Sequence, residues 1–159
     1  MAFAIGMTNA GPEMRMHHRL IDALYSEAML LADEARDYFD EGGRIERDSL
    51  DPPTRVRFSC ESLKVTTRLM HVIAWFLVQR AVRAGELEFR DALDPARRLG
   101  DAPETEQVVI DALPSKARYL IQSSIDLHRR VTVLDLAQDA PIVSASPALS
   151  MQRRLASAF

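Results

Sequence analysis

The chain has 159 residues, of which 47% are hydrophobic and 27% charged, and its formal net charge is −3 at pH 7. These proportions are typical of a folded domain and exclude wholesale disorder, and a domain of this length buries roughly two-thirds of the surface that its unfolded chain exposes. The slightly acidic balance excludes a general basic field for nucleic acid. Because Cys60 is the only cysteine, an intrachain disulfide and a zinc finger are excluded as well.

The apolar stretches are short for a membrane protein. Met70 to Val78 is the most apolar segment, and its nine residues compare with the ~20 that a membrane span needs. The opening residues MAFAIGM lack the basic region of a secretion signal. Together with the lone cysteine, these features predict a cytoplasmic protein without a membrane span.

The first long helix is predicted from Pro12 to Gly42, since proline suits a first helical position and glycine suits a helix end. One face of this helix is apolar at spacings of three and four residues, so we expect it to face the core. Its residues are Leu20, Leu24, Ala28, Leu31, Ala35 and Tyr38.

The second long helix has a clear start, with Asp51 as the N-cap and Pro52 at the first helical position, and it is predicted to reach Ala84 before Gly85. It would be about 50 Å long. A run of alternating steps of four and three residues predicts the core-facing seam of a bundle. That seam comprises Val56, Cys60, Leu63, Thr67, Met70, Ala74, Leu77 and Ala81.

The second half of this helix is apolar nearly all round. Three helices cover only part of a helix circumference, so the excess predicts a dimer interface. Simple burial in a three-helix core is the alternative. The residues that we expect at the interface are Val72, Trp75, Phe76 and Val82.

A long connection from Gly85 to Leu113 follows, with a short helix expected at Glu104–Ala112, and a third long helix is predicted from Pro114 to Gln138. The fold class is therefore all-α. We predict an up-down-up three-helix bundle with a long crossover between helices two and three. Residues 1–11 form a flexible N-terminus, residues 12–139 a dimerising domain and residues 140–159 a disordered tail in this prediction.

The tail contains two prolines, four serines, five alanines and no acidic residue, a composition that cannot build a core. Its apolar residues Met151, Leu155 and Phe159 nevertheless recur at i, i+4 and i+8, which is the anchor spacing of a peptide that folds into a groove. Arg153 and Arg154 lie elsewhere on the same helical wheel and favour a groove with an acidic rim. A frayed terminus without function is the alternative.

Carboxylates gather at the end of the first helix, at Asp33, Asp37, Asp40 and Glu41. Negative charge is unfavourable at a helix C-terminus, so the placement makes these residues a candidate docking surface for a basic partner, although a solvated helix face is the first interpretation of such a charge run. A solvated helix face and a divalent-cation site are the alternatives.

Residues that carry catalysis or bind metals show no supporting pattern. The motifs GxxxxGK[ST], GxGxxG, HExxH and GxSxG are absent from the sequence. His17 and His18 point about 100° apart on a helix, and His71 and His128 lack the preceding glutamate of di-iron bundles. Cys60 belongs to the predicted seam and is expected to be a buried hydrophobe. We therefore predict no catalytic residue, no metal and no cofactor.

Three segments carry a resemblance to a known family. They are MRMHHRLIDALYSEAMLLADEARDYFD, RLMHVIAWFLVQRAVRAGELEF and KARYLIQSSIDLHRRVTVLDLAQ. Read together and in this order, with their connections and the tail, they resemble the regulator of CtrA degradation (RcdA) family over nearly the whole chain.

The resemblance implies a homodimeric three-helix protein of the bacterial cytoplasm that acts as a proteolytic adaptor in cell-cycle control. Such an adaptor links substrates to the ClpX unfoldase of the ClpXP protease, with a priming response regulator and a cyclic-di-GMP-binding adaptor as further partners. CtrA is among the cargo that the resemblance implies, and the cell pole is the implied location. The family offers no short catalytic motif to carry over to this chain.

Three other functions remain as alternatives. The first is a helical dimeric scaffold for localisation that has no role in protease delivery. The second is a metal-dependent enzyme that uses the carboxylate group with His17 or His18. The third is a nucleic-acid regulator that uses Arg129, Arg130, Arg153 and Arg154, although the acidic body opposes phosphate contacts.

Overall fold

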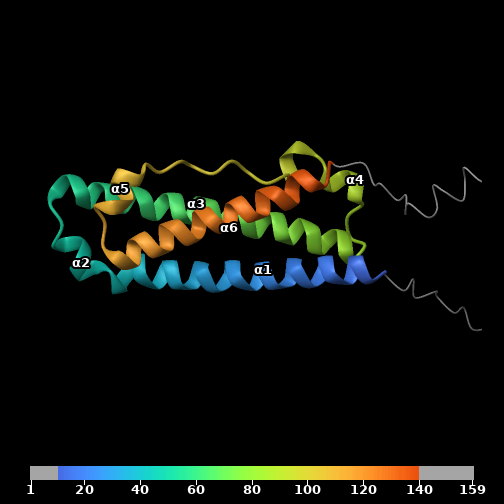
Figure 1. The fold of residues 1–159 in the computed structure, drawn as a ribbon, viewed down its shortest axis with the longest axis horizontal. Coiled ribbons are helices and arrows are strands. Elements are labelled where there is room, and N and C mark those ends of the chain that lie inside the picture. The colour runs from blue at the N-terminus through green and yellow to red at the C-terminus, as the bar shows by residue number, and fades with distance from the viewer. Residues whose placement is uncertain (1–10, 140–159) are drawn as a thin grey trace, which may run out of the picture.

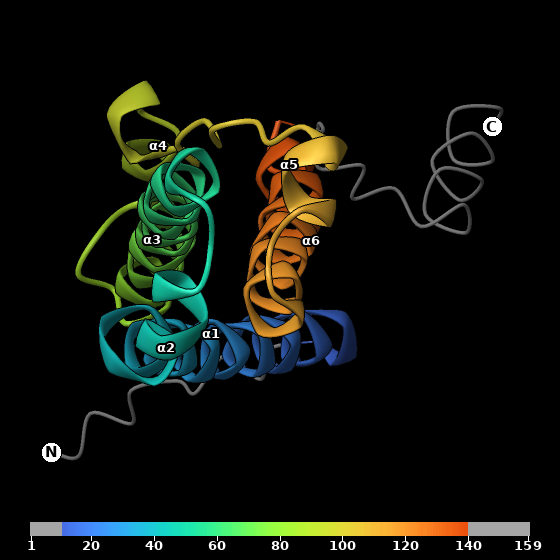
Figure 2. The ribbon, with the colours of Figure 1, turned by 90° about the vertical axis from the view of Figure 1, so that its left-hand side faces the viewer.

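The computed structural model describes residues 11–139, and three long helices that lie side by side dominate it (Figure 1). They are α1 (Pro12–Asp37), α3 (Pro52–Arg83) and α6 (Ser115–Ala137), and in the view from one end α3 and α6 stand next to each other with α1 lying across below both (Figure 2). The described part has no β-strand, so the all-α prediction is confirmed. The short elements are a π-helical turn (Tyr38–Gly42), α2 (Arg44–Asp48), α4 (Phe89–Ala92), a 3-10 turn (Pro95–Arg97) and α5 (Gln107–Asp111).

Local signals place the ends of the long helices close to where they were predicted. The Asp51 side chain accepts a hydrogen bond from the Thr54 amide, and Pro52 opens α3. Gly85 adopts a φ of +75° directly after the C-cap of α3, a conformation that costs glycine little. The boundaries of α3 therefore follow from its capping residues.

The end of α1 is anchored by a π-helical turn around Tyr38. The Tyr38 hydroxyl donates a hydrogen bond to Glu46 Oε2, and its ring packs at 5.9 Å from the ring of Phe58. A Cβ at Gly43 would lie 2.8 Å from the same tyrosine ring, so only glycine lets the chain pass so closely. Burial and the Glu46 carboxylate raise the pKa of Tyr38, so this phenol stays neutral and ties α2 to the bundle.

The direction of α6 differs from the prediction. Arg68 of α3 donates to Ser124 and Trp75 of α3 donates to Asp135, so the two helices run parallel. Because Asp22 of α1 binds Arg83 at the far end of α3, α1 is antiparallel to α3. The up-down-up prediction is wrong, and the order is up-down-down.

The crossover explains this order. It runs back along the whole bundle, so that α6 starts at the same end as α3 (Figure 1). A connection of this length is what parallel neighbours require, whereas antiparallel neighbours need only a short loop.

Residues 98–106 of the crossover form an extended strap that lies along α3 and α6. Basic side chains from both helices donate hydrogen bonds to its backbone carbonyl oxygens, which fix an otherwise irregular segment. The four bonds are Lys64 to Glu104 O (2.7 Å), Arg68 to Pro103 O (2.8 Å), His71 Nδ1 to Asp101 O (3.0 Å) and His128 Nε2 to Gly100 O (2.8 Å).

The core face of α1 agrees with the predicted stripe, except that Ile21 is buried and Leu20 is 44% exposed. The seam predicted for the second helix is wrong: Val56, Leu63 and Met70 are 64%, 69% and 64% exposed. Cys60 is exposed as well. The face of α3 that packs on the core instead comprises Phe58, Glu61, Val65, Arg68, Leu69, Val72, Trp75 and Phe76.

The close contact between Gly100 of the strap and His71 of α3 leads to a stability prediction. A Cβ at Gly100 would lie 2.6 Å from His71 Nδ1, so the imidazole must move and its bond to Asp101 O is lost. We expect Gly100→Ala to destabilise the protein by about 1–3 kcal/mol, measured by urea denaturation. The cost should shrink in a His71→Ala background, and Gly11→Ala, whose Cβ meets nothing within 4 Å, should cost less than about 1 kcal/mol as a change of the N-cap of α1. Equal cost in both backgrounds would contradict the contact.

Candidate interaction surfaces

Three of the four residues expected at a dimer interface lie inside the chain's own core. Val72 and Phe76 are 0% exposed and Trp75 is 2% exposed, so they offer no surface to a second copy. The fourth, Val82, is half-buried in a groove of about 420 Å³ beside α4, next to Met14. The interface assigned to these residues is therefore corrected. The strap supplies the missing cover, since Leu99 packs against the core.

An apolar stripe on α3 faces outward instead. It continues from the start of the helix into its second half, where Leu77 is 51% exposed. Large apolar side chains that recur every seventh residue along an exposed helix are typical of a helix-packing surface. We call this set the α3 stripe, and it comprises Val56, Cys60, Leu63, Met70, Ala74 and Leu77.

The predicted carboxylate group is exposed at the end of α1. Asp37, Asp40 and Glu41 line one hollow of about 530 Å³ together with Arg36. Asp33 is exposed one turn before Asp37. The structure thus brings three of the four carboxylates together, and whether they dock a partner stays a prediction.

A groove between α1 and α3 lies beside these carboxylates. Its volume is about 410 Å³, and its edge includes Asp40 and Arg36. Leu63 and Met70 of the α3 stripe form part of its wall. We call it the α1–α3 groove, and its other lining residues are Ala32, Ala35, Phe39, Ser62, Thr66, Leu69 and Ile73.

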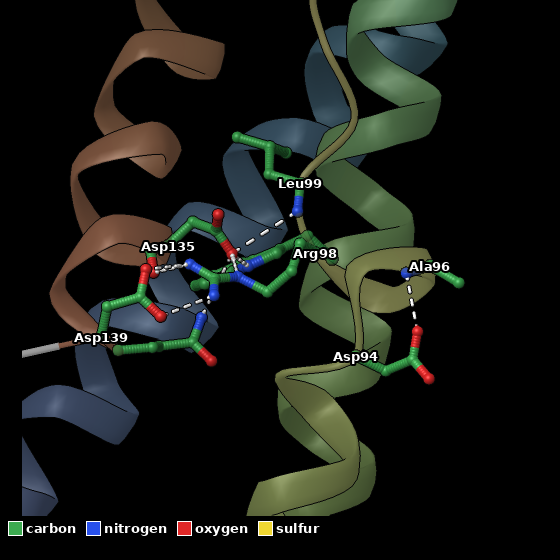
Figure 3. A network of polar contacts seen from close by, with 8 residues as sticks. Asp94, Ala96, Arg98, Leu99, Asp135 and Asp139 are labelled. Carbon is green, nitrogen blue, oxygen red and sulfur yellow. Dashed lines mark hydrogen bonds and ion pairs between the residues drawn. The ribbon is translucent and has the colours of Figure 1, made fainter.

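A polar network holds the strap to the end of α6 (Figure 3). The Arg98 guanidinium donates to Asp135 Oδ1 at 2.9 Å and to Asp139 Oδ1 at 2.8 Å, and Trp75 Nε1 donates to Asp135 Oδ1 at 2.8 Å. The Arg98 bond holds the pKa of Asp139 below its ordinary value, and the two carboxylates raise that of Arg98. The sequence pattern gave no sign of Arg98, which stands in an aperiodic segment.

A second network is buried under the middle of the strap. Arg68, which is 0% exposed, donates to Thr105 Oγ1 at 2.8 Å, and Thr105 Oγ1 donates to Glu61 Oε2 at 2.6 Å. Burial lowers the pKa of Arg68, and the nearby Glu61 carboxylate opposes that shift. These side chains bind one another and the backbone, so their role is structural.

The histidines and carboxylates do not form one site. His17 and His18 stand at the start of α1 and Asp37 at its end, about 30 Å apart at 1.5 Å per residue. Within residues 11–139, no group of three His, Cys, Asp or Glu side chains is arranged to hold a metal ion. In the same range, no helix has the length and apolar character needed to cross a membrane. The remaining predicted partner-binding residues, Met151, Arg153, Arg154, Leu155 and Phe159, lie outside the described residues.

The fold and these surfaces define a helical protein whose exposed features are an apolar stripe, a groove and a carboxylate group. Residues 13–159 match the family described as "Protein of unknown function (DUF1465)". The crystal structure of RcdA from Caulobacter crescentus CB15 is similar with a TM-score of 0.62 and 35% identity, covering 75% of this chain and 90% of that chain. A comparison with curated proteins finds no match. The chain therefore belongs to the RcdA family.

The carboxylate–arginine pairs generate a pH prediction. The pKa of Asp139 is lowered by Arg98, that of Asp22 by Arg83 and that of Asp126 by Arg129. A carboxylate with a lowered folded-state pKa stabilises the fold above its unfolded pKa of about 4 and loses that contribution as pH falls through the folded value. The melting temperature should therefore fall as pH drops below about 4.

Arg98→Met removes one of these pairs, together with the bonds from Arg98 to Asp135. The difference in melting temperature between wild type and Arg98→Met should be larger at neutral pH than in acid, because protonated Asp139 no longer binds Arg98 as an ion. Arg90→Met is the control, since the Arg90–Glu88 pair is highly exposed. A difference that stays constant with pH would contradict the assignment.

Proposed function

We propose that this chain is a non-enzymatic adaptor for regulated proteolysis that links cell-cycle substrates and other adaptors to the ClpXP protease. The observation that carries the proposal is membership of the RcdA family, with 35% identity to the Caulobacter crescentus protein. The exposed stripe and groove support it, because an adaptor acts through surfaces that its own fold leaves open.

The proposed mechanism is an increase in effective concentration. A scaffold that binds both a cargo and the unfoldase converts a bimolecular encounter into a local one, without any bond chemistry of its own. The partners in this proposal are ClpX with its priming response regulator, a cyclic-di-GMP-binding adaptor and cargo such as CtrA. Recruitment to the cell pole belongs to the same proposal.

The proposal assigns one role to the carboxylate group and another to the tail. The docking surface for a basic segment is the carboxylate group of Asp33, Asp37, Asp40 and Glu41, because neighbouring negative charges attract a positively charged partner. The tail, with Arg153 and Arg154, supplies a basic amphipathic segment that docks on an apolar groove with an acidic rim.

Reconstituted degradation tests the adaptor role. CtrA degradation by ClpXP, with the response regulator and the cyclic-di-GMP-binding adaptor present, should accelerate severalfold when this chain is added. Val133→Ala is the matched control, because Val133 is 63% exposed on α6, away from the α3 stripe and the carboxylate group. If the chain neither accelerates degradation nor co-purifies with primed ClpX, the localisation scaffold is the better description.

We propose in addition that the chain dimerises through the α3 stripe. Met70→Asp combined with Leu77→Asp should yield monomer with little loss of stability, because both side chains are more than half exposed at 64% and 51%. Phe76→Asp, in contrast, should unfold the chain, since it buries an unpaired charge in the core.

Light scattering and thermal melts read out the two effects. Val133→Asp on α6 is the matched control, as Val133 is 63% exposed on another helix. A wild type that is monomeric at micromolar concentration, or a dimer that survives both stripe substitutions, would refute this interface.

A further inference from the structure

The α1–α3 groove is an open apolar site at the middle of the bundle. Leu63 and Met70, which form part of its wall, are 69% and 64% exposed although Leu69 beneath them is 3% exposed. Side chains of this size gain most by being covered. The groove therefore presents a built surface, of about 410 Å³, on which a short amphipathic segment fits.

The charges at the groove select a basic occupant. Asp40 lines its edge, and Asp37 and Glu41 share with Asp40 the adjoining hollow. Arg36 borders both cavities and is the one cation among their lining residues, so carboxylates outnumber cations there. A peptide that places two arginines beside its apolar anchors is complementary to this edge.

The chain itself carries such a peptide. Met151, Leu155 and Phe159 repeat at i, i+4 and i+8, and Arg153 and Arg154 stand between them off that face. As a helix, residues 151–159 would span about 14 Å, and the wall of the groove from Ser62 to Ile73 spans about 17 Å along α3. Length, apolar spacing and charge all match.

The connection is long enough for this segment to reach the groove in the same molecule. The described chain ends at Asp139, and Trp75 Nε1 lies 2.8 Å from Asp135 Oδ1, so the end of α6 is level with Trp75. Ile73 at the near end of the groove is about 3 Å further along α3, and crossing two helix widths adds about 20 Å. The eleven residues 140–150 span up to ~36 Å when extended.

We propose that residues 151–159 dock in the α1–α3 groove of their own chain, with Met151, Leu155 and Phe159 on the apolar wall and Arg153 and Arg154 at the carboxylate edge. The tail thereby covers Leu63 and Met70, which also belong to the α3 stripe. A docked tail and a second copy of the chain compete for these two side chains, so the dimer proposed above requires the tail to leave the groove. The inference concerns contacts within one chain and stands whether or not the adaptor role is right.

Cys60 provides the probe for a direct test. It is the only cysteine, is exposed, and lies one turn before Leu63. A nitroxide attached to Cys60 in the ¹⁵N-labelled full chain should increase the transverse relaxation of the amides of residues 151–159 severalfold over the reduced label. A second sample mixes two kinds of chain: one is ¹⁵N-labelled and carries no nitroxide, and the other carries the nitroxide and no ¹⁵N label. The relaxation of the same tail amides should be unchanged in this mixture.

Variants identify the contacts. Leu155→Ser with Phe159→Ser, Arg153→Glu with Arg154→Glu, and Leu63→Ser should each abolish most of the relaxation increase. Val133→Ser is the matched control for Leu63→Ser, because Val133 is equally apolar, 63% exposed and on α6. Circular dichroism checks that each variant keeps its helices.

Three results would overturn the inference. A relaxation increase in the mixed sample would mean that the tail docks on a second copy rather than on its own chain. An equal increase in the tail variants and the wild type, or no increase in any sample, would mean that the tail does not occupy the groove.

Discussion

The guanidinium of Arg68 is the point at which α3, α6 and the crossover strap are joined. It is 0% exposed and donates to Ser124 of α6 and to Pro103 and Thr105 of the strap. Removing one member of a buried charged set costs about 3–5 kcal/mol, because the remaining groups stay buried without partners. The strap is therefore held along the length of α3. Since the strap runs back along the bundle, α6 must begin where α3 begins, which makes these helices parallel.

Sequence patterns predicted the parts of the fold that depend on local chemistry. The starts of the long helices follow from Pro12 and from Asp51 with Pro52, and the end of α3 follows from Gly85. The core face of α3 was not predicted, because Glu61 and Arg68 break its apolar pattern and read as solvent-exposed positions. They are buried only because Thr105 and the Pro103 carbonyl, about forty residues later, satisfy their hydrogen bonds.

One unrecognised element accounts for two of the three structural errors, the dimer interface and the direction of α6. A segment with Pro95, Gly100 and Pro103 has no periodicity, so nothing in it predicted that its carbonyl oxygens would bind two histidines, a lysine and an arginine. Without knowledge of the strap, the apolar residues around Trp75 indicated a dimer interface. For the same reason α6 was predicted to be antiparallel to α3. The carboxylate group at the end of α1 was foreseen, since charge on an exposed helix end depends on no distant partner.

The two apolar faces of α3 differ in how much they contribute to the stability of the fold. The face that includes Glu61, Arg68 and Phe76 is buried in the core, and its polar groups are hydrogen-bonded within the chain. The α3 stripe contributes little to folding, because side chains such as Leu63 at 69% exposure have lost only part of their contact with water. Changes in the stripe therefore cost the fold little, which is the property that the proposed interface requires.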